Sequence, residues 1–112
     1  MVSIYYEDSL DSRVPELVRQ HIPLGELALV ADAQTYEVLG ARIHKRFAQK
    51  DVRLILLGER VNATLKQAQE IGRQAQGCAG ILAVGSGTIN DLCKYASFEL
   101  KVPYLVFPTA PS

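Results

Sequence analysis

This sequence of 112 residues contains only two cysteines and has no excess of positive or negative charge. The two cysteines, Cys78 and Cys93, cannot form a disulfide framework and show no CxxC spacing, so we expect both to be small buried apolar groups. Twelve basic and twelve acidic residues cancel to a formal net charge of zero. Without a basic face, neither nucleic-acid binding nor electrostatic attachment to a membrane is expected.

Long hydrophobic runs are also missing. The longest span roughly five residues, whereas a membrane-spanning helix needs about 20. The N-terminal segment reaches charged residues at Glu7 and Asp8 without the apolar stretch of a secretory leader. We therefore expect a cytoplasmic protein.

Motifs for metal binding and for nucleophilic catalysis are absent as well. His21 and His44 have no acidic or histidine partner at the spacing of metal ligands, and no GxSxG sequence marks a nucleophile. The chain is therefore predicted to contain neither catalytic residues nor metal ligands of its own.

Four short apolar runs do recur along the chain, at residues 27–31, 52–57, 81–84 and 104–107. Their starts lie 25, 29 and 23 residues apart, which is close to the ~30 residues of a βαβ unit. The runs are almost continuously apolar, as in parallel strands that are covered on both faces. The predicted fold class is therefore α/β, a Rossmann-like parallel sheet with helices on both faces.

Between these runs, apolar residues recur at helical spacing. A first helix is expected from about Thr35 to Gln49, a second after Asn62, which is a good N-cap residue, and a third after the run at 81–84. The apolar faces comprise Tyr36, Leu39, Ile43 and Phe47 in the first helix, Leu65, Ala68, Ile71 and Ala75 in the second, and Ile89, Leu92, Cys93, Ala96 and Leu100 in the third.

We expect residues 1–112 to form one α/β domain, in which residues 1–26 precede a core of residues 27–112. Among the first residues, Val2, Ile4 and Tyr6 alternate like a short edge strand. Residues 15–21 can form a helix with a proline in its first turn. The sequence stops just after the fourth apolar run, where such a fold normally enters another helix. We therefore expect the chain to be the front part of a longer protein.

The turn after the third apolar run is the strongest candidate for a binding site. Residues Gly85, Ser86, Gly87 and Thr88 join a buried strand to a helix, and the first amides of a helix lack internal partners and carry partial positive charge. We expect Gly87 to adopt backbone angles that are closed to other residues and Thr88 to cap the helix. The free amides would bind the pyrophosphate of a dinucleotide. A tight turn without a ligand is the alternative, because this is not the usual GxGxxG fingerprint.

Two aspartates suit the same ligand. Asp91 lies one turn into the helix, and beside a pyrophosphate it must point sideways, toward the nicotinamide or the substrate. Stabilisation of the helix dipole is the alternative role, and Lys94 can form a surface ion pair with Asp91. Asp32 follows the first apolar run. Its carboxylate can accept from ribose hydroxyls and favour NAD over NADP, or it can cap the next helix.

Two hydroxyl residues follow the fourth apolar run. Ligands of open α/β sheets bind at the carboxyl ends of the strands, so Thr109 and Ser112 could bond the nicotinamide ribose or an amide. Ordinary turn residues are the alternative.

Two segments carry a family resemblance. Gly-Ser-Gly-Thr-Ile-Asn-Asp-Leu-Cys-Lys-Tyr-Ala at residues 85–96 and Pro-Thr-Ala-Pro-Ser at residues 108–112 resemble the iron-containing alcohol dehydrogenase and dehydroquinate synthase superfamily. Within it, the sequence most resembles the sn-glycerol-1-phosphate dehydrogenases, whose first strand and helix are similar to residues 30–37. Ser86 departs from the family pattern, because it replaces the middle glycine of a Gly-Gly-Gly turn.

The resemblance implies the cofactor-binding domain of an NAD(P)-dependent dehydrogenase that interconverts dihydroxyacetone phosphate and glycerol 1-phosphate, in phospholipid metabolism. A divalent metal, usually zinc in this branch, would polarise the substrate from a helical domain beyond residue 112. The fragment alone is therefore expected to be inactive. The residues implied in binding NAD or NADP are Asp32, Gly85, Ser86, Gly87, Thr88, Asp91, Thr109 and Ser112.

Partners implied in the same way are the dinucleotide, a small polyol phosphate and further copies of the chain in a homo-oligomer. Other functions fit the same residues. They are glycerol dehydrogenase or another iron-type alcohol dehydrogenase, a dehydroquinate synthase-like lyase, and a non-enzymatic nucleotide-binding module.

Overall fold

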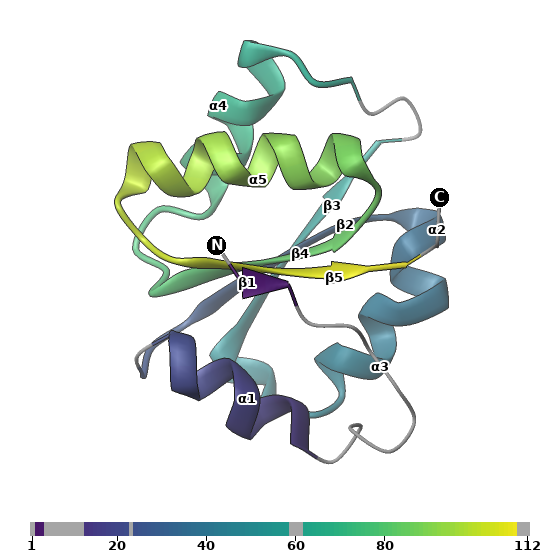
Figure 1. Ribbon diagram of the computed structural model, residues 1–112, viewed down its shortest axis with the longest axis vertical. Coiled ribbons are helices and arrows are strands. Elements are labelled where there is room, and N and C mark those ends of the chain that lie inside the picture. The colour runs from purple at the N-terminus through teal and green to yellow at the C-terminus, as the bar shows by residue number, and fades with distance from the viewer. Residues whose placement is uncertain (1, 4–12, 23, 59–61, 110–112) are drawn as a thin grey trace.

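A single parallel sheet organises the fold. The computed structural model describes residues 2–3, 13–22, 24–58 and 62–109, and its five strands lie in the order β1-β5-β4-β2-β3 (Figure 1). The strands are β1 (Val2–Ser3), β2 (Leu27–Asp32), β3 (Val52–Leu57), β4 (Gly80–Gly85) and β5 (Tyr104–Pro108). The α-helices are α1 (Val14–His21), α2 (Ala33–Thr35), α3 (Ala41–His44), α4 (Leu65–Gln74) and α5 (Gly87–Leu100).

Helices cover both faces of this sheet. Figure 1 shows α4 and α5 on one face and α1, α2 and α3 on the other. Because successive residues of a strand point to opposite faces, an apolar strand such as β2 supplies both layers. Ala28 and Val30 pack in the α4–α5 layer, whereas Leu27, Leu29 and Ala31 pack in the opposite layer. The predicted α/β parallel sheet is confirmed.

The strands lie where the apolar runs predict them. β3 has the predicted bounds, and β2, β4 and β5 each extend the run by one or two residues. β1 pairs in parallel with β5 through Val2 and Ser3, so the predicted edge strand is confirmed there, while Ile4 and Tyr6 lie outside the described residues. The helix expected at residues 15–21 is α1, which carries its proline in the first turn.

The helix expected from Thr35 to Gln49 is confirmed as far as His44, but it is irregular and ends five residues early. It consists of α2, a π-helix at Tyr36–Gly40 and α3, which ends at His44. A short 3₁₀ turn follows at Gln49–Asp51. Because Gly40 has no side chain, the Tyr36 ring can pack directly against it. A Cβ at residue 40 would lie only 2.8 Å from Tyr36 Cδ1. The Tyr36 hydroxyl thereby lies 2.9 Å from Nδ1 of His44, within hydrogen-bonding distance.

The start of α4 also differs from the expectation. Thr64, and not Asn62, is the N-cap, because its side chain accepts a hydrogen bond from the Gln67 amide at 3.2 Å. Leu65, expected on the apolar face, is 56% exposed, since it lies in the first turn beyond the edge of the core. The other expected residues of that face, Ala68, Ile71 and Ala75, are buried.

Both cysteines are buried and neither forms a disulfide, which confirms their predicted role as apolar groups. Burial raises the pKa of the Cys78 thiol and of the Cys93 thiol. Within the described residues, no helix combines the length and the hydropathy needed to cross a membrane.

Candidate functional site

The carboxyl ends of β2 and β4 mark a change of direction in the sheet. These two strands are neighbours, but β2 leads into α2 on one face and β4 leads into α5 on the other (Figure 1). Such a switch in strand order leaves a crevice outside the strand ends, which is where open α/β sheets bind their ligands. Both helices have their N-termini at this crevice.

Gly85 allows the two helix starts to meet. Its φ of +144° lies in a region that favours glycine, and a Cβ there would come within 2.8 Å of Ile89 Cδ1 and 3.0 Å of Thr35 Cγ2. The expectation that Gly87 takes such angles is wrong, because Gly87 is the first residue of α5 and Gly85 has the positive φ. A Cβ on Gly87 would project into open space, with no neighbour within 4 Å.

The N-terminus of α5 has no side-chain cap. Ser86, and not Thr88, occupies the N-cap position, so the expected cap is wrong, and the Ser86 side chain makes no capping hydrogen bond. The first helical bond runs from the Asn90 amide to the Ser86 carbonyl at 3.0 Å. The amides of residues 87–89 are therefore donors without an intrahelical partner, which suits an anion.

A pocket of about 230 Å³ opens beside this helix start. It is lined by Gly85, Ser86, Gly87, Asn90, Val106, Pro108 and Thr109. None of these side chains carries a charge. An anion here would therefore be recognised by backbone amides, by hydroxyl groups and by one carboxamide.

That carboxamide belongs to Asn90, which is not among the residues that the sequence motifs single out. Its Oδ1 atom is buried and has no hydrogen-bond partner in the described part of the chain. Leaving such a group unpaired costs about 1–3 kcal/mol in a folded protein. The sequence could have indicated Asn90 as a site residue, because residue 90 lies three positions after Gly87 and hence on the same side of the helix.

Asp91 does not line the pocket of the glycine turn. It is exposed and lines a separate cavity of about 270 Å³ between α4 and α5, together with Thr64, Leu65 and Tyr95. The structure therefore does not bring Asp91 into the pocket of the glycine turn. No ion pair joins Asp91 to Lys94 among the residues that the structure describes.

The other predicted residues divide between the pocket and its surroundings. Thr109 lines the pocket, while Ser112 lies outside the described residues. Asp32 caps α2, because its Oδ1 accepts from the Thr35 amide at 2.7 Å and the Asp32 amide donates to Thr35 Oγ1 at 3.0 Å. The capping alternative is thus confirmed, and contact with a ribose stays a prediction.

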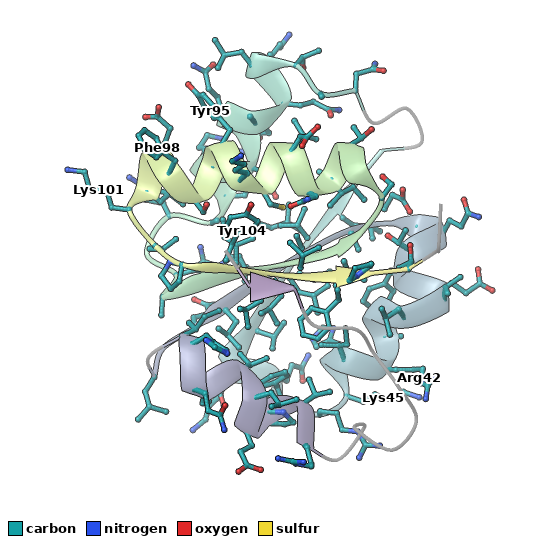
Figure 2. The ribbon with its side chains drawn as sticks, in the orientation of Figure 1. Arg42, Lys45, Tyr95, Phe98, Lys101 and Tyr104 are labelled. Carbon is teal, nitrogen blue, oxygen red and sulfur yellow. The ribbon has the colours of Figure 1, made fainter. Side chains whose placement is uncertain are left out.

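A larger cavity lies at the opposite end of α5. It measures about 620 Å³, and Figure 2 shows Phe98 and Lys101 at that end of the helix and Tyr104 beneath it. No carboxylate is among the described residues that line the cavity. Of its basic residues, His21 and Lys101 lie near the C-termini of α1 and α5, where cations stabilise helices, and Lys94 lies in the middle of α5. We therefore place the candidate site at the glycine turn.

No group of three His, Cys, Asp or Glu side chains that could hold a metal occurs in the described ranges 2–3, 13–22, 24–58 and 62–109. The residues present therefore do not fit the divalent metal that the family resemblance implies.

Known proteins match nearly the whole chain. Residues 5–112 match the family described as iron-containing alcohol dehydrogenase. A glycerol-1-phosphate dehydrogenase (NAD(P)+) of Bacillus subtilis strain 168 is 32% identical over 112 residues, which cover 94% of this chain and 27% of that protein. An enzyme of the same name from Halalkalibacterium halodurans is 37% identical over 93 residues, covering 77% of this chain and 23% of that protein.

Solved structures share the fold. Glycerol dehydrogenase from Schizosaccharomyces pombe superposes with a TM-score of 0.79 over 95% of this chain and 27% of that one, at 18% identity. A probable glycerol dehydrogenase from Sinorhizobium meliloti 1021 gives 0.67 over 96% and 28%, at 23% identity. At these identities the likeness concerns the fold alone. The chain spans about a quarter of the length of these relatives.

Proposed function

This chain belongs to the iron-containing alcohol dehydrogenase family, and from that premise we propose that it forms the dinucleotide-binding part of an NAD(P)-dependent dehydrogenase acting on a polyol phosphate. Glycerol 1-phosphate is the proposed substrate, because relatives at 32% and 37% identity bear the name glycerol-1-phosphate dehydrogenase. The observation that carries the proposal is the pocket at the switch in strand order, where two helix N-termini begin beside Gly85 and Gly87.

The residues of this pocket fit a dinucleotide in specific ways. The pyrophosphate would accept hydrogen bonds from the amides of residues 87–89, which Ser86 leaves uncapped. The absence of a side chain at Gly87 allows a phosphate to approach the backbone. Thr109 would add a hydroxyl from the end of β5. Asp32 lies outside the pocket lining, at the end of β2, the strand that pairs with β4, and would lie toward a ribose. When bound, the nicotinamide would supply the hydride chemistry of the reaction.

Metal chemistry is no part of what these residues can do. We derive no metal-dependent step from this chain, since its described residues hold no suitable ligand group. We therefore expect the 112 residues alone to bind cofactor without oxidising glycerol 1-phosphate.

Calorimetric titration with NAD⁺ tests the proposal. We expect the 112-residue chain to bind NAD⁺ with a dissociation constant in the millimolar range or below. A Gly87→Val substitution should weaken binding about tenfold or more, equivalent to about 1.4 kcal/mol, because its side chain would occupy the space that a phosphate needs.

Gly72→Val provides the matched control. Gly72 is also a helical glycine at which an added Cβ would meet no atom within 4 Å, but it lies in α4, away from the pocket. This variant should bind NAD⁺ like the unsubstituted chain. Equal binding by Gly87→Val, with circular dichroism showing that it is folded, would contradict the proposed site.

A further inference from the structure

Two buried polar atoms, Asn90 Oδ1 and Tyr104 Oη, have no hydrogen-bond partner among the described residues. Folded proteins contain few such atoms, because an unpaired buried polar group costs free energy. The two residues line different cavities. Tyr104 opens β5 beneath α5 (Figure 2), whereas Asn90 lines the pocket of the glycine turn. Only Asn90 therefore lies where a ligand of the proposed dinucleotide site could supply the missing hydrogen bond.

An apolar residue would suit position 90 better if only folding mattered. The neighbouring residues Ile89 and Leu92 are buried, and Asn90 itself is half-buried near the N-terminus of the same helix. A side chain such as leucine would leave no polar atom unpaired there. The unmet hydrogen bond of Asn90 is thus a cost to stability that binding can offset.

A carboxamide is also chemically suited to this place. It carries no charge, so it can lie beside a pyrophosphate that a carboxylate would repel. It offers a donor and an acceptor at its two ends, and half a turn about its last bond presents either end to the pocket. A phosphate oxygen could accept from its nitrogen, and a ribose hydroxyl or a carboxamide could donate to its oxygen.

We propose that Asn90 is a cofactor-contacting residue, whose carboxamide hydrogen-bonds the dinucleotide held on the Gly85–Gly87 turn at the expense of the stability of the free protein. The inference rests on the proposed function and deepens it. It also places the side-chain contact at Asn90 and not at the next residue, Asp91, which is exposed on another side of α5.

Two properties of an Asn90→Leu variant test the inference together. We expect its thermal unfolding midpoint to stay the same or to rise by about 5 °C, because the unpaired polar atom is gone. We expect its dissociation constant for NAD⁺ to rise about tenfold. A merely structural asparagine would lower the midpoint and leave the affinity of the folded protein unchanged.

Asn90→Asp and Tyr104→Phe complete the set. Asn90→Asp keeps the shape but places a negative charge beside the pyrophosphate, so it should weaken NAD⁺ binding at least as much as Asn90→Leu. Tyr104→Phe removes the other unpaired atom, and Tyr104 lines the cavity at the C-terminal end of α5 and not the pocket of the glycine turn. It should match or exceed the stability of the unsubstituted chain and bind NAD⁺ equally well.

The outcomes separate this inference from the proposed function. If the unsubstituted chain binds NAD⁺ and the Asn90 variants bind it equally, the role of Asn90 is overturned and the dinucleotide site stands. If the unsubstituted, folded chain binds no NAD⁺, both fall. If Asn90→Leu does not fold, its stabilising effect is disproved, and Asn90→Asp alone decides the contact.

Discussion

At the scale of single residues, the thiol of Cys93 is a fully buried ionisable group. Burial raises its pKa, since no neighbouring charge offsets the loss of water. In the unfolded chain this thiol ionises near its ordinary pKa of 9.0, whereas in the folded chain it stays protonated. The folded state then binds more protons than the unfolded state, so the free energy of unfolding must fall as pH rises above about 9.

We predict that this loss reaches about 1–2 kcal/mol per thiol by pH 10. Urea unfolding at pH 8, 9 and 10 measures it, and Cys93→Ala serves as the comparison, because tyrosine ionisation near pH 10 affects both proteins alike. The variant has lower stability throughout because of the lost side-chain volume, but its stability should fall less steeply with pH. Parallel curves for the two proteins would show that Cys93 does not carry the effect.

The candidate site shows what residue types can and cannot predict. The glycine turn is recognisable because two closely spaced glycines end a buried apolar strand and an amphipathic helical pattern begins directly after them. Which glycine has the positive φ depends on how α2 approaches, through Thr35, and that contact is tertiary. Whether Asn90 or Asp91 faces the pocket depends on the rotation of α5 about its own axis. The packing of the buried residues Ile89 and Leu92 sets that rotation.

At the scale of elements, the strands were predictable and the first helix of the core was predictable only in part. The runs at 27–31 and 52–57 are short, apolar and bounded by polar residues, which is typical of buried strands. Residues 36–49 carry a helical period, but the period does not show where the helix widens around Gly40 or that it stops at His44. At Gly40 the close approach of the Tyr36 ring, 2.8 Å from where a Cβ would lie, is a feature of the packing that the period does not show.

Asp32 allows a prediction at the start of α2. Replacing it with alanine removes the capping bond to the Thr35 amide and should lower the free energy of unfolding by about 1 kcal/mol. Serine keeps an acceptor at the N-cap but removes the charge, so Asp32→Ser should be nearly as stable as the unsubstituted chain. Urea unfolding compares the three proteins.

Asp32→Ser also separates capping from cofactor choice. Without the carboxylate, repulsion of a ribose phosphate disappears, so the affinity for NADP⁺ should rise relative to that for NAD⁺. Titration of the same protein with each dinucleotide measures the ratio. An unchanged ratio in a fully stable Asp32→Ser variant would leave Asp32 as a helix cap alone.

At the scale of the whole molecule, the topology itself positions the site. The chain runs from β2 outward to β3 and returns to β4 on the other side of β2, and so places the helices before and after β3 on opposite faces. The same path leaves β3 as an outer strand that pairs only with β2 among the described strands. One edge of β3 therefore has backbone groups without a strand partner, which favours pairing with another chain.

Side chains on β3 add to that tendency. Leu54 and Leu56 are 37% and 53% exposed, and their alternation places them on the same face of the sheet. We predict that the chain self-associates through this strand, and that replacing both residues with lysine reduces the association. Sedimentation velocity over a wide range of protein concentration is the measurement. The sedimentation coefficient should rise with concentration in the unsubstituted chain and much less in the double variant.

Leu24→Lys tests whether the effect belongs to the strand or to exposed leucine in general. Leu24 is 88% exposed but lies in the turn before β2, outside any strand edge. It also changes the net charge in the same direction. This variant should associate like the unsubstituted chain, because an isolated apolar side chain on a turn offers neither a backbone edge nor a continuous apolar face. If Leu24→Lys reduces association as strongly as the β3 variant, then added charge is the cause and the β3 edge is not the interface.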